Sequence, residues 1–437
     1  MRLLPLVAAT YFMVSGGPYG IEDILGGAGY AKALIILVTL PFLWSLPTAL
    51  MIGELASAIP AEGGFYVWVR RALGPFWGYQ EAWLSLTASI FDMAIYPTLF
   101  VLYLGRLFPG WTAGSRGTLW ELAVIVGCCL WNLRGAPAVG NGSLGLFFLL
   151  LTPFAVLVGA AFLHGRHVPV QGMWSMHGSE ETGLATAILV GLWNYMGWDN
   201  ASTVAQEVED PQRNYPRAMV MSTIVVAVTY VVPLFAMAWV AFPIDQFTTG
   251  SWTDAARSLA GPWLGTAIVI GGTLTAFGMF NALMMSYARL PMTLAEDGML
   301  PSVLALRNRR GVPWVAVLAC GIAWALALQF SFERLISMDL MLYGASLILE
   351  FVALIVLRIR EPRLERPFRA GNLATACLIG AVPTGLILYA VWCSRNERMA
   401  HMPALLFGAI IACSGPIFYR FSKTIWARPE PLPNPGD

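Results

Sequence analysis

The sequence predicts an all-α integral membrane protein with about twelve transmembrane helices in a five-plus-five inverted repeat, in which helices 1 and 6 are broken. The chain is 57% hydrophobic and only 12% charged, whereas soluble proteins carry about 25% charged residues. Apolar runs of roughly 20 residues, the length that crosses a bilayer, recur along the chain. Helix-breaking residues interrupt the first and the sixth of these runs, which lie at matching positions in two halves.

The expected spans fill the chain and leave no room for a sizeable soluble domain. We expect a first repeat in residues 1–163, a second repeat in residues 183–358 and two additional helices in residues 373–423, all within a single membrane domain. An odd number of spans per repeat inverts the second half relative to the first. Hydropathy alone indicates the repeat, since no residue-level match between the halves is evident. The spans are expected at residues 3–27, 33–58, 76–104, 118–133, 143–163, 183–207, 217–242, 263–288, 313–330, 336–358, 373–393 and 402–420.

The basic residues predict the orientation of these spans. With the N-terminus in the cytoplasm, most of the 26 lysines and arginines fall on the cytoplasmic side, as the positive-inside rule requires. We therefore expect a multi-pass protein of the cell (plasma) membrane with both termini cytoplasmic. A net charge of +1 gives no indication of a nucleic acid partner. The six cysteines lie in apolar spans, and neither a catalytic triad nor a metal-ligand cluster is apparent, so we expect no enzyme activity, metal or cofactor.

The first break reads S-G-G-P-Y-G-I-E-D and runs from Ser15 to Asp23. Gly16, Gly17 and the proline after them release backbone groups that lipid cannot satisfy, so such a break is tolerated only beside a protein cavity. In transporters that cavity holds the substrate. The adjacent Glu22 and Asp23 favour a cationic substrate; one is expected to face the cavity and the other to cap the following helix.

The second break, N-Y-M-G-W-D-N, runs from Asn194 to Asn200. Asp199 either caps the outgoing half-helix or binds the substrate, and both roles are compatible.

Two further spans each carry one polar stripe, because residues 11 apart on a helix share a face to within roughly 20°. Asp92 is the strongest site candidate, since a carboxylate this deep in a span costs about 2.5–3.5 kcal/mol; the alternative is a structural hydrogen bond or a permanently protonated acid. Glu350 either binds the amine, carries the coupling proton or forms an ion pair with a neighbouring helix. The stripes comprise Glu81, Ser85, Asp92 and Tyr96 in the third span, and Asp339, Tyr343, Ser346 and Glu350 in the tenth.

Aromatic residues near the breaks and stripes suit a cation, because an ammonium over an aromatic face gains up to about 2 kcal/mol. The alternative is ordinary packing or an interfacial belt. These candidates are Tyr19, Tyr96, Trp193, Tyr195, Trp198 and Tyr343. Glu54 and Glu207 lie at cytoplasmic helix ends, where gate or anchor salt bridges with arginines are expected instead of substrate contacts.

The chain resembles the amino acid–polyamine–organocation (APC) superfamily from end to end, and within it the polyamine uptake transporters. The resembling segments include Ser15–Asp23, Phe91–Phe100 (F-D-M-A-I-Y-P-T-L-F), Trp198–Val208 (W-D-N-A-S-T-V-A-Q-E-V) and Leu347–Ala353 (L-I-L-E-F-V-A). The resemblance implies the five-plus-five inverted-repeat (LeuT-type) fold and uptake of polyamines or related amines by proton symport. Amino-acid-transporting relatives have Gly-Ser-Gly where this chain has Gly20-Ile21-Glu22, and a carboxylate there repels a substrate carboxylate.

Two alternatives remain. One is a permease or exchanger of cationic or diverse amino acids, and the other is a membrane receptor on a transporter scaffold. A sodium site is less favoured than proton coupling, although Thr273 and Thr275 could supply oxygen ligands. No span contains a lysine to replace sodium, which leaves Glu350 and Asp92 as candidates for proton coupling.

Overall fold

The computed structural model describes residues 1–164, 181–243, 247–330, 332–399 and 401–426. Within these residues the chain is helical, apart from turns and the antiparallel pair β1 (Arg398–Met399) and β2 (Met402–Pro403). The first half of the chain contains α1 (Leu3–Val14), α2 (Glu22–Leu40), η1 (Pro41–Ser45), α3 (Leu46–Ala58), α4 (Phe65–Leu73), α5 (Pro75–Leu107), α6 (Pro109–Thr112), α7 (Ser115–Asn132) and α8 (Ala136–His164).

The second half is helical as well. It contains α10 (Glu181–Asn194), η2 (Trp198–Glu207), α11 (Pro211–Trp239), α12 (Trp252–Ala260), α13 (Pro262–Tyr287), α14 (Arg289–Glu296), η4 (Ser302–Ala305), α15 (Trp314–Ala325), η5 (Leu326–Gln329) and α16 (Phe332–Arg360). The chain then adds α17 (Leu373–Cys393), η6 (Ser394–Asn396) and α18 (Ala404–Ile425).

Both breaks that the sequence predicts interrupt a helix: α1 ends at Val14 and α10 ends at Asn194. Helix α1 has 12 residues and α10 has 14, and neither reaches the roughly 20 residues that cross a bilayer. Among the described residues, 8 helices are long and apolar enough to do so. They account for most of the expected spans, and the two broken spans are among those that fall short.

A break in helix α2 falls between the expected first and second spans. Gly29 has a φ of 73° and a ψ of 169°, which are not helical, so it divides α2 into two helical parts. Glycine adopts this conformation readily because it has no Cβ. The second part of α2 is followed directly by η1 and α3.

The two breaks lie inside the bundle. Helix α1 packs against α8, α11 and α13, and α10 packs against α2. The 33-residue helix α5 packs against α13, α16, α4 and α18. Residues near the middle of α5 and α16 are therefore brought beside the broken segments.

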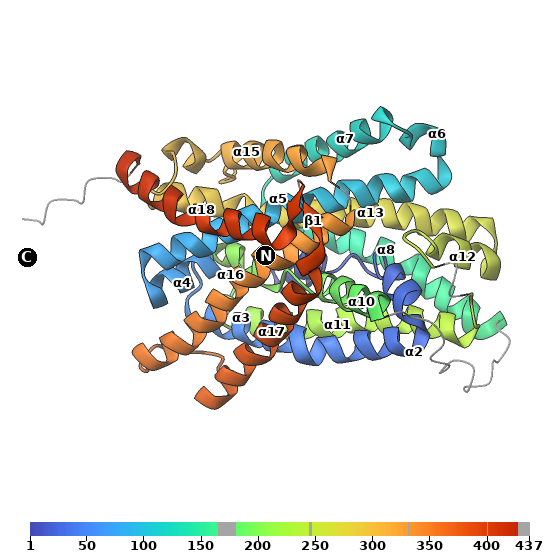
Figure 1. Ribbon diagram of the computed structural model, residues 1–437, viewed down its shortest axis with the longest axis horizontal. Helices are drawn as coiled ribbons and strands as arrows, with labels where there is room; N and C mark the ends of the chain where they lie inside the picture. Colours follow the sequence, from blue (N-terminus) through green and yellow to red (C-terminus); the bar gives the residue numbers. More distant parts are fainter. Residues whose placement is uncertain (165–180, 244–246, 331, 400, 427–437) are drawn as a thin grey trace, which may run out of the picture.

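A short sequence motif occurs twice in the chain, once in each half. Gly63, Arg70, Gly74-Pro75 and Gly78 recur with the same spacing as Gly250, Arg257, Gly261-Pro262 and Gly265. In each copy an amphipathic helix, α4 or α12, ends at a glycine with φ of 97° or 91°, and proline then starts a long helix. Proline at the first helical position is favoured because it has no N–H to leave unpaired. Figure 1 shows α4 and α12 at opposite ends of the bundle.

Each copy of the motif contacts one break. The Gly63 N–H donates to the Thr203 carbonyl in η2 (3.4 Å), and the Gly250 N–H donates to the Glu22 carboxylate at the start of α2 (3.1 Å). This match between the halves is hard to find in the sequence alone, because the two copies have only glycine, arginine and proline residues in common.

Candidate functional site

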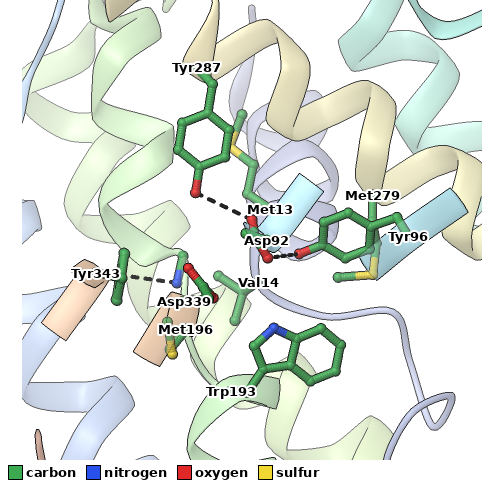
Figure 2. A pocket seen from close by; sticks show the side chains of 11 residues that line it. Met13, Val14, Asp92, Tyr96, Trp193, Met196, Met279, Tyr287, Asp339 and Tyr343 are labelled. Atoms are coloured by element: carbon green, nitrogen blue, oxygen red, sulfur yellow. Dashed lines mark hydrogen bonds between the residues drawn. The ribbon is translucent and has the colours of Figure 1, made fainter. Parts of the chain in front are cut away.

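A small cavity lies where the breaks meet α5, α13 and α16. Figure 2 shows the side chains around it. The end of α1 contributes two residues, α5 two, the second break and the end of α10 three, and α13 and α16 two each. The lining residues are Met13, Val14, Asp92, Tyr96, Trp193, Met196, Gly197, Met279, Tyr287, Asp339 and Tyr343.

Asp92 lies between two phenol groups (Figure 2). The Tyr96 hydroxyl donates to one carboxylate oxygen at 2.8 Å, and the Tyr287 hydroxyl donates to the other at 3.3 Å. Asp339 is also buried, and its Oδ1 has no hydrogen-bond partner among the described residues. The cavity therefore has two carboxylates. Both oxygens of Asp92 accept from hydroxyl groups, whereas Oδ1 of Asp339 accepts from no described residue.

The second break brings a third carboxylate close to this cavity. The Tyr343 hydroxyl, on the cavity wall, donates to Asp199 and accepts from the Gly197 N–H at 3.1 Å. Gly197 has a φ of 88°, and a Cβ there would collide with the Met13 carbonyl oxygen. Glycine is needed here so that the end of α1 can approach the second break this closely.

Among the described residues, no basic side chain forms an ion pair with these acids. The ion pairs of the described residues lie elsewhere, and none includes Asp92, Asp199 or Asp339. The rings of Tyr96 and Trp193 lie 6.4 Å apart and nearly parallel, which gives the cavity an aromatic wall. Buried carboxylates without a cation beside aromatic faces form a site suited to a positively charged ligand.

The structure separates the acids of the first break from this cavity. The Glu22 carboxylate accepts from the Tyr103 hydroxyl (2.7 Å), the Gly20 N–H (2.7 Å) and the Gly250 N–H (3.1 Å). Asp23 accepts from the backbone N–H and the hydroxyl of Thr249 at 3.2 and 2.9 Å. Both side chains hold the segment before α12, and neither is among the residues that line the cavity.

Gly16, Gly17 and Tyr19 of the first break are also not among the residues that line the cavity. The Gly17 N–H donates to the Ser15 hydroxyl (3.0 Å), and Gly16 lies against Thr275 and Met279. The Tyr19 hydroxyl donates to the Ile268 carbonyl (2.5 Å). These contacts stabilise the break without bringing its side chains to the cavity.

Three of the six predicted aromatic residues, Tyr96, Trp193 and Tyr343, line the cavity. The other two members at the second break pack inside the bundle. The Tyr195 hydroxyl donates to the Leu37 carbonyl (2.9 Å), and the Trp198 indole N–H donates to the Tyr195 carbonyl (2.8 Å).

Glu54 is fully buried and satisfied by arginines. It accepts from Arg358, lies 3.3 Å from Arg366 and accepts from the Ala370 N–H at 2.8 Å. The side chain of Glu207 lies outside the described residues. Glu350 is fully buried on α16 and does not line the cavity.

Several lining residues were not predicted as site residues. Asp339 could have been included, because it lies on the same stripe as Tyr343. Met196 could also have been included, because it lies within the second break between Tyr195 and Trp198. Tyr287, Met13 and Met279 lie in ordinary apolar runs, and nothing in their spacing distinguishes them. Among the described residues, no group of three or more histidine, cysteine or acidic side chains could hold a metal ion.

Comparisons with known proteins identify the kind of protein that carries this cavity. The family model described as Amino acid permease matches residues 7–413. The Polyamine transporter PUT1 of Oryza sativa subsp. japonica is 34% identical over 98% of this chain and 80% of its own. The Polyamine transporter RMV1 of Arabidopsis thaliana is 30% identical over 98% of this chain and 87% of its own. The Serine/threonine exchanger SteT of Bacillus subtilis is 25% identical over 83% of this chain and 82% of its own.

Proposed function

The chain belongs to the amino acid permease family of the APC superfamily and is a multi-pass membrane transporter, and from this premise we propose that it imports polyamines. The substrates are cations of the putrescine and spermidine type. Transport follows alternating access and is driven by protons. The observation that carries this proposal is the set of buried carboxylates Asp92, Asp339 and Asp199, for which the described part of the chain supplies no basic partner at the cavity.

The first break provides the argument against an amino acid substrate. A bare backbone N–H at a broken helix is what a substrate carboxylate binds in transporters of this type. Here the Gly20 N–H already donates to the Glu22 carboxylate of the chain itself (2.7 Å), and the Gly17 N–H donates to Ser15. A polyamine has no carboxylate and needs neither group, whereas its ammonium groups need acids.

The repeated motif supports the five-plus-five architecture. In this proposal residues 1–163 and 183–358 are the inverted repeats, and residues 373–423 add two helices. An inverted repeat carries a motif from one end of the bundle to the other, and α4 and α12 lie at opposite ends in Figure 1. Several arginine pairs gather near α4, including Arg70–Asp297 and Arg71–Glu361. This favours the α4 end as cytoplasmic, with both termini inside and the protein in the plasma membrane.

A permease or exchanger of cationic or diverse amino acids is the second candidate. The observation that favours it is the similarity to the serine/threonine exchanger over 83% of this chain.

Ligand-induced stabilisation of the purified protein separates the two candidates. A ligand at 100 times its Kd adds about 2.7 kcal/mol to the free energy of unfolding. We expect putrescine and spermidine to raise the melting temperature, whereas leucine and serine leave it unchanged. Stronger stabilisation by leucine or serine than by either amine would replace the polyamine proposal with the amino acid permease. Uptake into proteoliposomes should rise with an inward proton gradient and persist without sodium.

A further inference from the structure

Two glutamates outside the cavity are buried without adequate partners. Glu81 on α5 and Glu350 on α16 are both 0% exposed, and α5 and α16 pack against each other. Neither oxygen of Glu350 has a hydrogen-bond partner among the described residues. Glu81 accepts from the Ser85 hydroxyl at 2.8 Å, while its Oε2 has no partner there.

These side chains act on each other. Within the described residues, the charged groups that influence Glu350 are Asp199 from η2 and Glu81 from α5, and the Tyr343 phenol lies two turns earlier on the same helix. Asp199 also acts on Glu81. All of these groups are acidic, so no cation offsets a charge on the pair. An isolated ionised carboxylate is strongly disfavoured in such surroundings and is relieved by binding a proton.

We propose that Glu81 and Glu350 form the proton-binding site of the transporter, separate from the amine cavity. This inference rests on the proposed function and assigns its coupling ion to particular residues. One proton from the outer water binds a carboxylate oxygen of the pair, cancels one negative charge and leaves to the cytoplasm after the transporter changes state.

The position of the pair favours a proton over an ammonium group. Glu81 and Asp92 are separated by 11 residues, as are Asp339 and Glu350, which corresponds to about 16 Å along a helix. The Asp92 and Asp339 ends line the cavity, and the Glu81 and Glu350 ends do not. An ammonium group needs a cavity of its own size, whereas a proton needs only an oxygen lone pair.

Asp199 links the two sites. Its charge acts on Asp92 and Asp339 at the cavity and also on Glu81 and Glu350. Tyr343 donates to Asp199 from the helix that carries Asp339 and Glu350. Because Asp199 belongs to the broken span, a change of charge at either site acts on the segment that must move during alternating access.

The experiment distinguishes transport of the amine itself from its coupling to the proton gradient. Glu81→Gln and Glu350→Gln keep the side-chain shape and imitate a permanently protonated acid. In proteoliposomes we expect both variants to retain putrescine exchange at equal pH and to lose accumulation driven by an inward proton gradient. Glu121→Gln, on α7 and outside the acidic group, is the matched control and should accumulate putrescine like the wild type.

Each other result contradicts the proposal. Gradient-driven accumulation by both glutamine variants shows that the proton binds elsewhere. Loss of stabilisation by putrescine in both variants shows that the pair binds the amine. Failure of both variants to fold shows that the pair is ionised and structurally required, because glutamine would replace a protonated acid without loss. If only one of the two variants folds, its gradient-driven accumulation and its stabilisation by putrescine decide between these outcomes. A wild type that neither binds nor moves amines contradicts the proposed function itself, a result distinct from all of these.

Discussion

Two glutamates, each 0% exposed, differ completely in their partners. Glu54 on α3 accepts from Arg358 of α16 and from the Ala370 N–H, and lies 3.3 Å from Arg366. Glu350 lies on α16 eight residues before that same Arg358, and its two oxygens have no hydrogen-bond partner among the described residues. Burial alone therefore does not distinguish a structural acid from a functional one; the presence or absence of a built-in cation does.

The region near α4 and the region around the cavity differ in the same way. Near α4, acids are matched by arginines of the chain, as in Arg70–Asp297 and Arg307–Glu296. Around the cavity, Asp92 and Asp339 have no such partner in the described part of the chain. Ion pairs therefore stabilise the α4 end of the bundle, whereas the acids at the cavity are left to pair with a cationic ligand.

The same substitution at both glutamates gives the largest expected contrast. Glu54→Gln leaves the buried Arg358 and the half-buried Arg366 without their anion, and losing one partner of a buried pair costs about 3–5 kcal/mol. Glu350→Gln replaces an acid that has no cation and should leave the free energy of unfolding unchanged or slightly higher. Thermal unfolding of the two ligand-free variants in one detergent measures the difference. Equal destabilisation by both would remove the distinction between them.

At the cavity, removing one charge should affect binding and spare folding. Asp92→Asn keeps the shape but removes an acceptor for an ammonium group, worth about 1.5–3 kcal/mol or roughly 10- to 150-fold in affinity. Spermidine affinity should fall by this factor in a binding titration, with the melting temperature of the empty protein preserved. Asp210→Asn is the control, because Asp210 is exposed and its left-handed backbone (φ 46°) also suits asparagine. Unchanged spermidine affinity in Asp92→Asn would exclude Asp92 from the site.

The sequence predicted the breaks and the polar stripes because both depend on local chemistry. Glycine and proline interrupt a helix wherever they occur, and residues 11 apart share a helix face in any bundle. The 8 long apolar helices of the described residues were predicted from the length and composition of their apolar runs.

The sequence could not predict where the side chains at the breaks point. One of Glu22 and Asp23 was expected to face the cavity. The partners of Glu22 are instead Tyr103 and Gly250, and Asp23 bonds to Thr249, all distant in sequence. Such a direction depends on tertiary contacts that no local pattern encodes. Tyr287 was missed for the related reason that only the packing of α13 against α5 brings it to Asp92.

An exposed ion pair between the ends of α4 and α16 should give the smallest effect. Arg71 and Glu361 are bonded at 2.9 and 2.6 Å, but their side chains are 43% and 32% exposed, and exposed pairs contribute about 0.2–1 kcal/mol. Hydrogen bonding to Arg71 lowers the pKa of Glu361 below its ordinary value. A lowered folded-state pKa stabilises the protein above the unfolded value of about 4.3, and this stability is lost as the pH falls through the lowered pKa. The melting temperature of Arg71→Gln should therefore lie slightly below that of the wild type at pH 7 and converge with it in acid. High salt at pH 7 should also reduce the gap, because exposed charges are screened. A gap as large as that of Glu54→Gln, or one that persists unchanged in acid, would mean that this end of the bundle depends on exposed pairs as much as on the buried one.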